Sequence, residues 1–104
     1  MITDYALLEE NKLKEIVVIG IVREEKFVNK GGKEFDFTEL WLEMNDKHQI
    51  MLRQKGKVSA KDFVNGKVMV QGNLFYGNID SDNPNAQSRV GYRLDYTDIA
   101  RTID

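Results

Sequence analysis

The chain has 104 residues and contains no cysteine, one histidine and one proline. The lack of cysteine excludes disulfides, thiolate zinc sites and thiol nucleophiles. A single histidine, His48, excludes a metal site built from several histidines, and its neighbours Lys47 and Gln49 offer it no carboxylate. We therefore expect His48 to be a surface residue at the end of a strand.

Long apolar runs are also missing. No stretch approaches the roughly 20 apolar residues of a membrane-spanning helix, and the first residues do not have the pattern of a leader peptide. Hydrophobic residues make up 41% of the chain, which suits one domain with a modest core. We expect a soluble, cytoplasmic protein.

Charge is unevenly distributed along the chain, although the net charge is only −2. Residues 1–46 hold six basic and eleven acidic side chains, and residues 68–104 hold three and five. Residues 47–67 hold six basic side chains and one acidic side chain. A local basic segment can bind polyanions even when the whole molecule is acidic. It is equally compatible with a solvated lysine surface that has no partner.

Five segments have the composition of β-strands: residues 14–28, 34–45, 48–54, 67–76 and 90–99. The first is rich in valine and isoleucine and contains Gly20, which fits a long strand that must bend sharply. Glycines 31 and 32 favour a turn after this strand, and residues 45–47 a tight hairpin turn after the second. Residues 1–13 are expected to form an arm or short helix, and residues 14–104 the domain.

One short helix is predicted between the third and fourth strands. Ser59 is a good N-cap for a helix over residues 60–64, and Asn65 and Gly66 suit its end. Three strands, a helix and two strands follow the order of the oligonucleotide/oligosaccharide-binding (OB) fold. We therefore predict an all-β protein, a five-stranded Greek-key OB barrel with a short helix between strands 3 and 4.

The residue pattern of the second predicted strand, residues 34–45, indicates that its two faces differ. Leu40, Leu42 and Met44 would point into the barrel, and the odd-numbered side chains would point outward. Single-stranded nucleic acid needs ring faces for its bases and cations for its backbone. The candidate residues are Phe35, Phe37, Trp41 and Phe75 for bases and Lys33, Lys47, Arg53 and Lys55 for phosphates, with Lys30 and Arg89 at the edges.

Two observations leave this assignment open. Glu39 and Glu43 share the outward face and would repel phosphate unless they pair with Arg53 or Lys47. Phe35 and Phe37 could instead close the barrel, with Trp41 in a subunit interface. The acidic balance and these carboxylates also suit an OB module that binds another protein, as a replication or recombination accessory factor.

Catalysis has little support in the sequence. Glutamates on an exposed strand face are usually surface residues, and Ser59 and Ser81 lack the context of a nucleophilic serine. Residues 31–33 read Gly-Gly-Lys but lack the spacing of a phosphate-binding loop. We expect no enzymatic activity, no cofactor and no metal.

From residue 14 to 103 the chain resembles the bacterial and phage single-stranded-DNA-binding protein family. The resemblance rests on Ile-Val-Val-Ile-Gly at 16–20, the aromatic strand at 35–44, Gly-Lys-Val-Met-Val-Gln-Gly-Asn-Leu at 66–74, and Tyr-Arg-Leu at 92–94 before Ile99. The chain is also similar to the primosomal OB proteins, which use the same scaffold.

This resemblance implies single-stranded DNA binding without sequence preference, and protection of the strand in replication or recombination. It further implies a homo-oligomer, a dimer or tetramer, with replication proteins as partners. The sequence departs from the family where Lys55 and Gln49 stand at positions that usually carry stacking aromatics. The family's glycine-rich tail with an acidic tip is also missing, so a tailless, phage-like version is expected.

Overall fold

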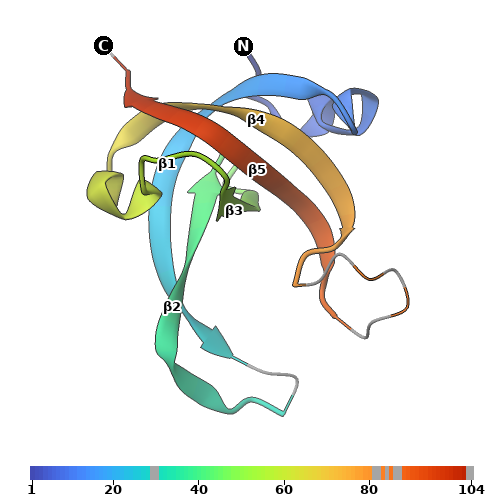
Figure 1. Ribbon diagram of the computed structural model, residues 1–104, viewed down its shortest axis with the longest axis vertical. Helices are drawn as coiled ribbons and strands as arrows, with labels where there is room; N and C mark the ends of the chain where they lie inside the picture. Colours follow the sequence, from blue (N-terminus) through green and yellow to red (C-terminus); the bar gives the residue numbers. More distant parts are fainter. Residues whose placement is uncertain (29–30, 81–82, 84, 86–87, 103–104) are drawn as a thin grey trace.

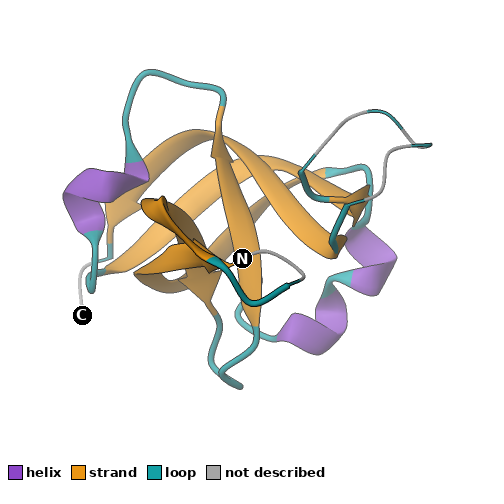
Figure 2. Cartoon of the chain, turned by 90° about the horizontal axis from the view of Figure 1, so that it is seen from below, coloured by secondary structure: helices purple, strands orange, loops and turns teal. Residues whose placement is uncertain are grey.

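The computed structural model describes residues 1–28, 31–80, 83, 85 and 88–102, so the predicted cation Lys30 lies outside the described part. Its strands are β1 (Glu15–Val28), β2 (Glu34–Glu43), β3 (Gln49–Gln54), β4 (Lys67–Asn78) and β5 (Val90–Arg101). They form one closed barrel (Figure 2). The order of the strands around it is β1-β2-β3-β5-β4. β3 and β5 run parallel, and the other neighbours run antiparallel. The prediction of an all-β chain with five strands is confirmed.

β1 closes the barrel because it pairs with a different strand in each half. Its first half, from Glu15 to Ile21, pairs with β4, and its second half, from Ile21 onward, pairs with β2. Gly20 lies at the change of partner, where a Cβ atom would come within 2.5 Å of the Glu43 carbonyl oxygen. A glycine is therefore required where the strand bends and a second backbone approaches closely.

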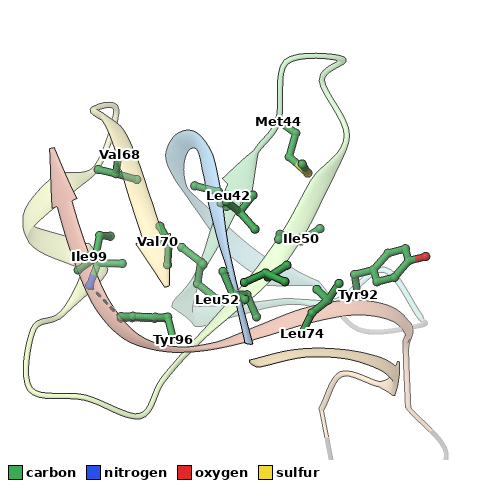
Figure 3. Packing of buried hydrophobic residues seen from close by; sticks show 14 of the residues in the cluster. Leu42, Met44, Ile50, Leu52, Val68, Val70, Leu74, Tyr92, Tyr96 and Ile99 are labelled. Atoms are coloured by element: carbon green, nitrogen blue, oxygen red, sulfur yellow. Dashed lines mark hydrogen bonds between the residues drawn. The ribbon is translucent and has the colours of Figure 1, made fainter. Parts of the chain in front are cut away.

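The core follows from strict alternation along the strands. Even-numbered residues of β1 and β2 face inward, and Val18, Val22 and Leu42 are completely buried. They meet inward-facing side chains from the other strands inside the barrel (Figure 3). These are Ile50 and Leu52 of β3, Val68, Val70 and Leu74 of β4, and Leu94, Tyr96 and Ile99 of β5. The odd-numbered side chains of β1 and β2 consequently point to the outside.

One end of the barrel is covered by a short turn, η3 (Ala60–Phe63), between β3 and β4. The Ser59 side chain accepts a hydrogen bond at its start, as predicted for an N-cap. The predicted helix over residues 60–64 is present in a shorter form, as a 3-10 helix of four residues, and Asn65 follows it in the left-handed region as predicted (φ 68°). Val64 leaves the turn in an extended conformation and bridges to Val22 of β1, which stops the helix after one turn.

The N-terminal residues cover the barrel on the side away from η3 (Figures 1 and 2). They form two 3-10 turns, η1 (Tyr5–Leu7) and η2 (Glu9–Asn11), and Leu8 between them is fully buried in the core. Ile2 adds a bridge to Val18 at the edge of β1. None of the helical turns in the described residues has the length and apolar character needed to span a membrane.

The far ends of β1 and β2 extend beyond the barrel as a two-stranded ribbon (Figure 1). The pairing of the two strands continues along this ribbon to Val28 and Glu34, with a shift in register between Lys26 and Val28. The ribbon gives the molecule its long dimension of 41 Å. It also carries three of the five phenylalanines, which bear on the functional site.

Candidate functional site

A row of outward-facing residues crosses all five strands of the barrel. Register places Arg23 of β1 beside Trp41 of β2, Trp41 beside Met51 of β3, Met51 beside Arg93 of β5, and Arg93 beside Phe75 of β4. We call these five residues the outer row. Because neighbouring strands lie about 5 Å apart, the outer row places rings, a thioether and guanidinium groups side by side across the sheet. Met51 and Arg93 in this row are buried.

Three rings on the ribbon form a second group, the phenylalanine cluster (Phe27, Phe35 and Phe37). Phe27 stacks on Phe37 with ring centroids 5.0 Å apart and planes at 16°. Phe35 lies 5.4 Å from Phe27 and 6.0 Å from Phe37. Phe37 is 53% exposed, which is unusual for so large an apolar side chain. We call the phenylalanine cluster and the outer row together the aromatic face.

Arg89 connects the aromatic face to the loop between β4 and β5. Its guanidinium donates to both Glu39 carboxylate oxygens, at 2.9 and 2.6 Å, and its Nε donates to Asp80 at 3.0 Å. The same guanidinium lies 4.8 Å from the Phe27 ring centroid and 5.8 Å from that of Trp41. We call Arg89, Glu39 and Asp80 the Arg89 bridge.

Hydrogen bonding in the Arg89 bridge shifts the pKa values of Asp80 and Arg89. The hydrogen bonds from Arg89, opposed in part by burial, lower the pKa of Asp80. The hydrogen bonds to Glu39 and then to Asp80 raise the pKa of Arg89. Asp80 and Arg89 are therefore charged at neutral pH. The carboxyl groups of Glu39 and Asp80 share one guanidinium beside the rings.

A second ionic network is centred on Arg93, a buried member of the outer row. Arg93 is only 1% exposed, and its guanidinium donates to Asp95 at 2.7 Å and to the Asn78 carbonyl at 3.2 Å. Asp95 also accepts a hydrogen bond from Arg53 at 3.0 Å. The Arg93 guanidinium lies 4.3 Å from the centroid of the Phe75 ring. The network holds Phe75 in place on the outer surface through a cation–π contact.

Glu39 and Glu43, the two carboxylates that the sequence places on the outward face of β2, are both paired with cations. Glu43 binds Arg23 at 3.3 Å and Lys47 at 3.5 Å, and the hydrogen bond from Arg23 lowers its pKa. The expected pairing of Glu43 with Lys47 is therefore present. Glu39 pairs with Arg89, as described above. Both pairings place a cation beside each carboxylate and reduce the repulsion of an approaching phosphate.

The structure brings some of the predicted binding residues together and separates others. Phe35, Phe37 and Lys33 are neighbours on the ribbon, where the Lys33 ammonium lies 5.3 Å from the Phe35 ring centroid. Trp41 and Phe75 lie at different places in the outer row and are partly buried. Arg53 is partly exposed and is bound to Asp95. The alternative that Phe35 and Phe37 close the barrel is wrong, because both lie on the projecting ribbon.

Two predicted lysines lie away from the rings. Lys47 is in the β2–β3 turn and lines a groove of about 460 Å³ with Ile19, Ile21 and Lys67. Lys55 follows β3, is exposed, and donates its backbone N–H to the Tyr96 carbonyl. These cations flank the barrel but do not contact the aromatic face.

Strands β2 and β3 separate beyond the pair Trp41–Met51 and leave a shallow groove of about 300 Å³. Thr38 and Leu40 line one side, and Leu52 and Gln54 line the other. Glu39 and Met51 also line this groove, so it opens directly beside the aromatic face. It offers a path from the rings toward Lys55 at the end of β3.

Sequence reasoning missed two features of this site. Phe27 was not selected, although the odd-numbered positions Arg23, Glu25 and Phe27 of β1 share one face and end at the ribbon. His48 was expected to have no carboxylate nearby, which is wrong because Asp46 lies 2.9 Å from its Nδ1. Its ring also stacks on Tyr5 at 4.3 Å, which ties the N-terminal turns to the β2–β3 turn.

The site as described consists of aromatic rings and paired charged side chains. In the described part of the chain, no three histidine, cysteine or acidic residues are grouped so that they could hold a metal ion. Comparison with protein-family models, with curated proteins and with solved structures finds no match for this chain. Functional assignment therefore depends on the geometry of the aromatic face.

Proposed function

We propose that this protein is an OB-fold barrel that binds single-stranded DNA on its aromatic face without strong sequence preference. The fold assignment is supported by the strand order, the parallel β3–β5 pair and the turn between β3 and β4. Binding would sequester and protect the strand in replication or recombination, with no bond made or broken.

The observation that carries the proposal is that the rings of the ribbon, Trp41 and Phe75 all lie on the outer side of the strands. Phe37 is exposed, Trp41 and Phe75 are partly exposed, and all three lie on the outside of the sheet. A base stacked on an aromatic ring contributes about 1–3 kcal/mol, whatever the base. Two or three such stacks with a few phosphate contacts would give useful affinity without reading sequence.

Basic residues near the face support the same assignment. Lys26 and Lys33 lie on the ribbon, and Lys55 and Lys57 follow β3. An extended strand that crosses the rings from the ribbon to the end of β3 would meet cations at both ends of its path. The overall charge of −2 is no obstacle, because only the local potential along that path acts on the phosphates.

A direct test measures the fluorescence anisotropy of labelled oligo-dT with the wild type and with Phe37→Ala. Loss of one stacking ring should weaken binding about tenfold. Leu7→Ala is the matched control, because Leu7 is also an exposed apolar residue but lies in η1, away from the ribbon. Equal affinity of Phe37→Ala and wild type would contradict the proposed site.

A second candidate function is binding of a cationic segment of another protein. One observation favours it: the Arg89 guanidinium binds two carboxylates and lies on two rings of the aromatic face. A partner's arginine would find the same chemistry there. An arginine-rich peptide that binds the protein, when oligo-dT does not, would favour this candidate.

A further inference from the structure

The Arg89 bridge occupies the centre of the aromatic face. Its guanidinium lies on Phe27 and Trp41, and a base that stacks on either ring needs the same space. A guanidinium is planar and stacks on rings much as a base does. Nucleic acid can therefore reach these rings fully only when the Arg89 side chain moves.

Phosphate can replace the carboxylates that hold Arg89. Carboxylate and phosphate both accept the paired N–H groups of a guanidinium in the same bidentate way. The Arg89 side chain is 31% exposed, and Asp80 is similarly exposed, so solvent and ligand reach the bridge. The two carboxylates, in contrast, repel phosphate for as long as they keep their charge.

The other arginines of the face do not combine these properties. Arg93 is buried under Phe75 and cannot reach a ligand without disturbing the barrel. Arg53 binds Asp95 within the same network. Arg23 and Arg53 are partly exposed as well, and Arg23 is bound to Glu43 and Asn65. Arg89 is partly exposed, bound to two carboxylates and stacked on two rings.

We propose that Arg89 is a binding residue that exchanges its partners when single-stranded nucleic acid binds, so that the Arg89 bridge restrains binding. Bases take the place of the guanidinium on Phe27 and Trp41, and the guanidinium leaves Glu39 and Asp80 for a phosphate. This inference rests on the proposed function. In the free protein Arg89 lies on Phe27 and Trp41, and the ligand must compete with it for these two rings.

The test compares wild type with the double variant Glu39→Gln/Asp80→Asn in oligo-dT titrations over a range of salt concentrations. Removal of both carboxylate charges should tighten binding about tenfold, because the guanidinium is no longer held. The plot of log affinity against log salt should steepen by about 0.7, the effect of one more phosphate contact on a single strand. Circular dichroism and thermal melting confirm that the variant is folded.

Two further variants separate the bridge from simpler explanations. Asp36→Asn removes one exposed negative charge from the same strand but not from the bridge, and should change affinity less than twofold. Arg89→Lys keeps the positive charge but loses the planar fork, and should bind at least as tightly as wild type. If the double variant does not fold, Arg89→Lys is compared with wild type in its place.

The possible results have distinct meanings. Tighter binding by the double variant, with little change in Asp36→Asn, supports the exchange. The exchange is overturned if the wild type binds as tightly as the double variant or more tightly. It is also overturned if Asp36→Asn gains as much affinity as the double variant. If neither wild type nor the double variant binds oligo-dT, the proposed function itself fails and the inference falls with it.

Discussion

Asp95 is the residue whose loss should most weaken the barrel through charge alone. It accepts hydrogen bonds from Arg93 at 2.7 Å and from Arg53 at 3.0 Å, and Arg93 is 1% exposed. Asp95→Asn keeps the shape but removes the negative charge. A buried cation would then lose its counter-ion, a change that typically costs 3–5 kcal/mol.

The lower end of that range applies here, because the asparagine oxygen still accepts one hydrogen bond and Asn78 and the Phe75 ring remain beside Arg93. We expect the free energy of unfolding to fall by about 3 kcal/mol at pH 7. With a urea m-value of about 1.5 kcal/mol/M, the midpoint should fall by about 2 M. The melting temperature should fall by about 15 °C for a domain of this size.

Urea unfolding followed by Trp41 fluorescence and by circular dichroism measures this change. Asp98→Asn is the matched control: Asp98 is exposed on the same strand, and asparagine can still accept the bond from the Ile99 N–H. Arg93→Met should cost less than Asp95→Asn, because Asp95 keeps Arg53 when Arg93 is removed. A cost for Asp95→Asn within 0.5 kcal/mol of that for Asp98→Asn, on the order of a surface substitution, would refute the reasoning.

Two other predictions concern backbone packing and pH. Gly72→Ala should prevent folding or cost several kcal/mol, because its Cβ would lie 2.3 Å from the Asp95 carbonyl oxygen. Gly91→Ala should be tolerated, because the atom nearest to its Cβ is 4.0 Å away. Equal melting temperatures of the two variants would contradict this prediction. Arg89 lowers the pKa of Asp80, so the ionised Asp80 stabilises the fold above its unfolded pKa and this contribution disappears as the pH falls. Asp80→Asn should therefore be less stable than wild type at pH 7 and approach it below about pH 4, and a difference that stays constant with pH would exclude the ion pair as its cause.

The strands and the inner face of the barrel could be predicted from sequence because they depend on local alternation. Val18 and Val22 lie at even-numbered positions of β1 and Leu42 at an even-numbered position of β2, and each is fully buried. The helix after Ser59 was predicted too long, because the bridge between Val64 and Val22 joins residues far apart in the chain. Local propensity carries no information about such a contact.

The ionic organisation of the candidate site could not be predicted for the same reason. Arg89 reaches Glu39 across 50 positions, and Arg53 reaches Asp95 across 42. The Arg53–Asp95 pairing follows from the register of β3 and β5, and the Arg89–Glu39 pairing depends on the loop before β5. Alternating hydrophobicity specifies neither of them. Sequence alone therefore identified rings and cations on the outside, but not which cations are held by carboxylates.

The most direct test of the central claim is the fluorescence of Trp41, the only tryptophan, during titration with oligo-dT at low salt. We predict saturable quenching, because bases stack on the aromatic face, and recovery of the signal as added salt displaces the phosphate contacts. An emission spectrum that does not change while the protein stays folded would show that bases do not reach this face, and would contradict the account.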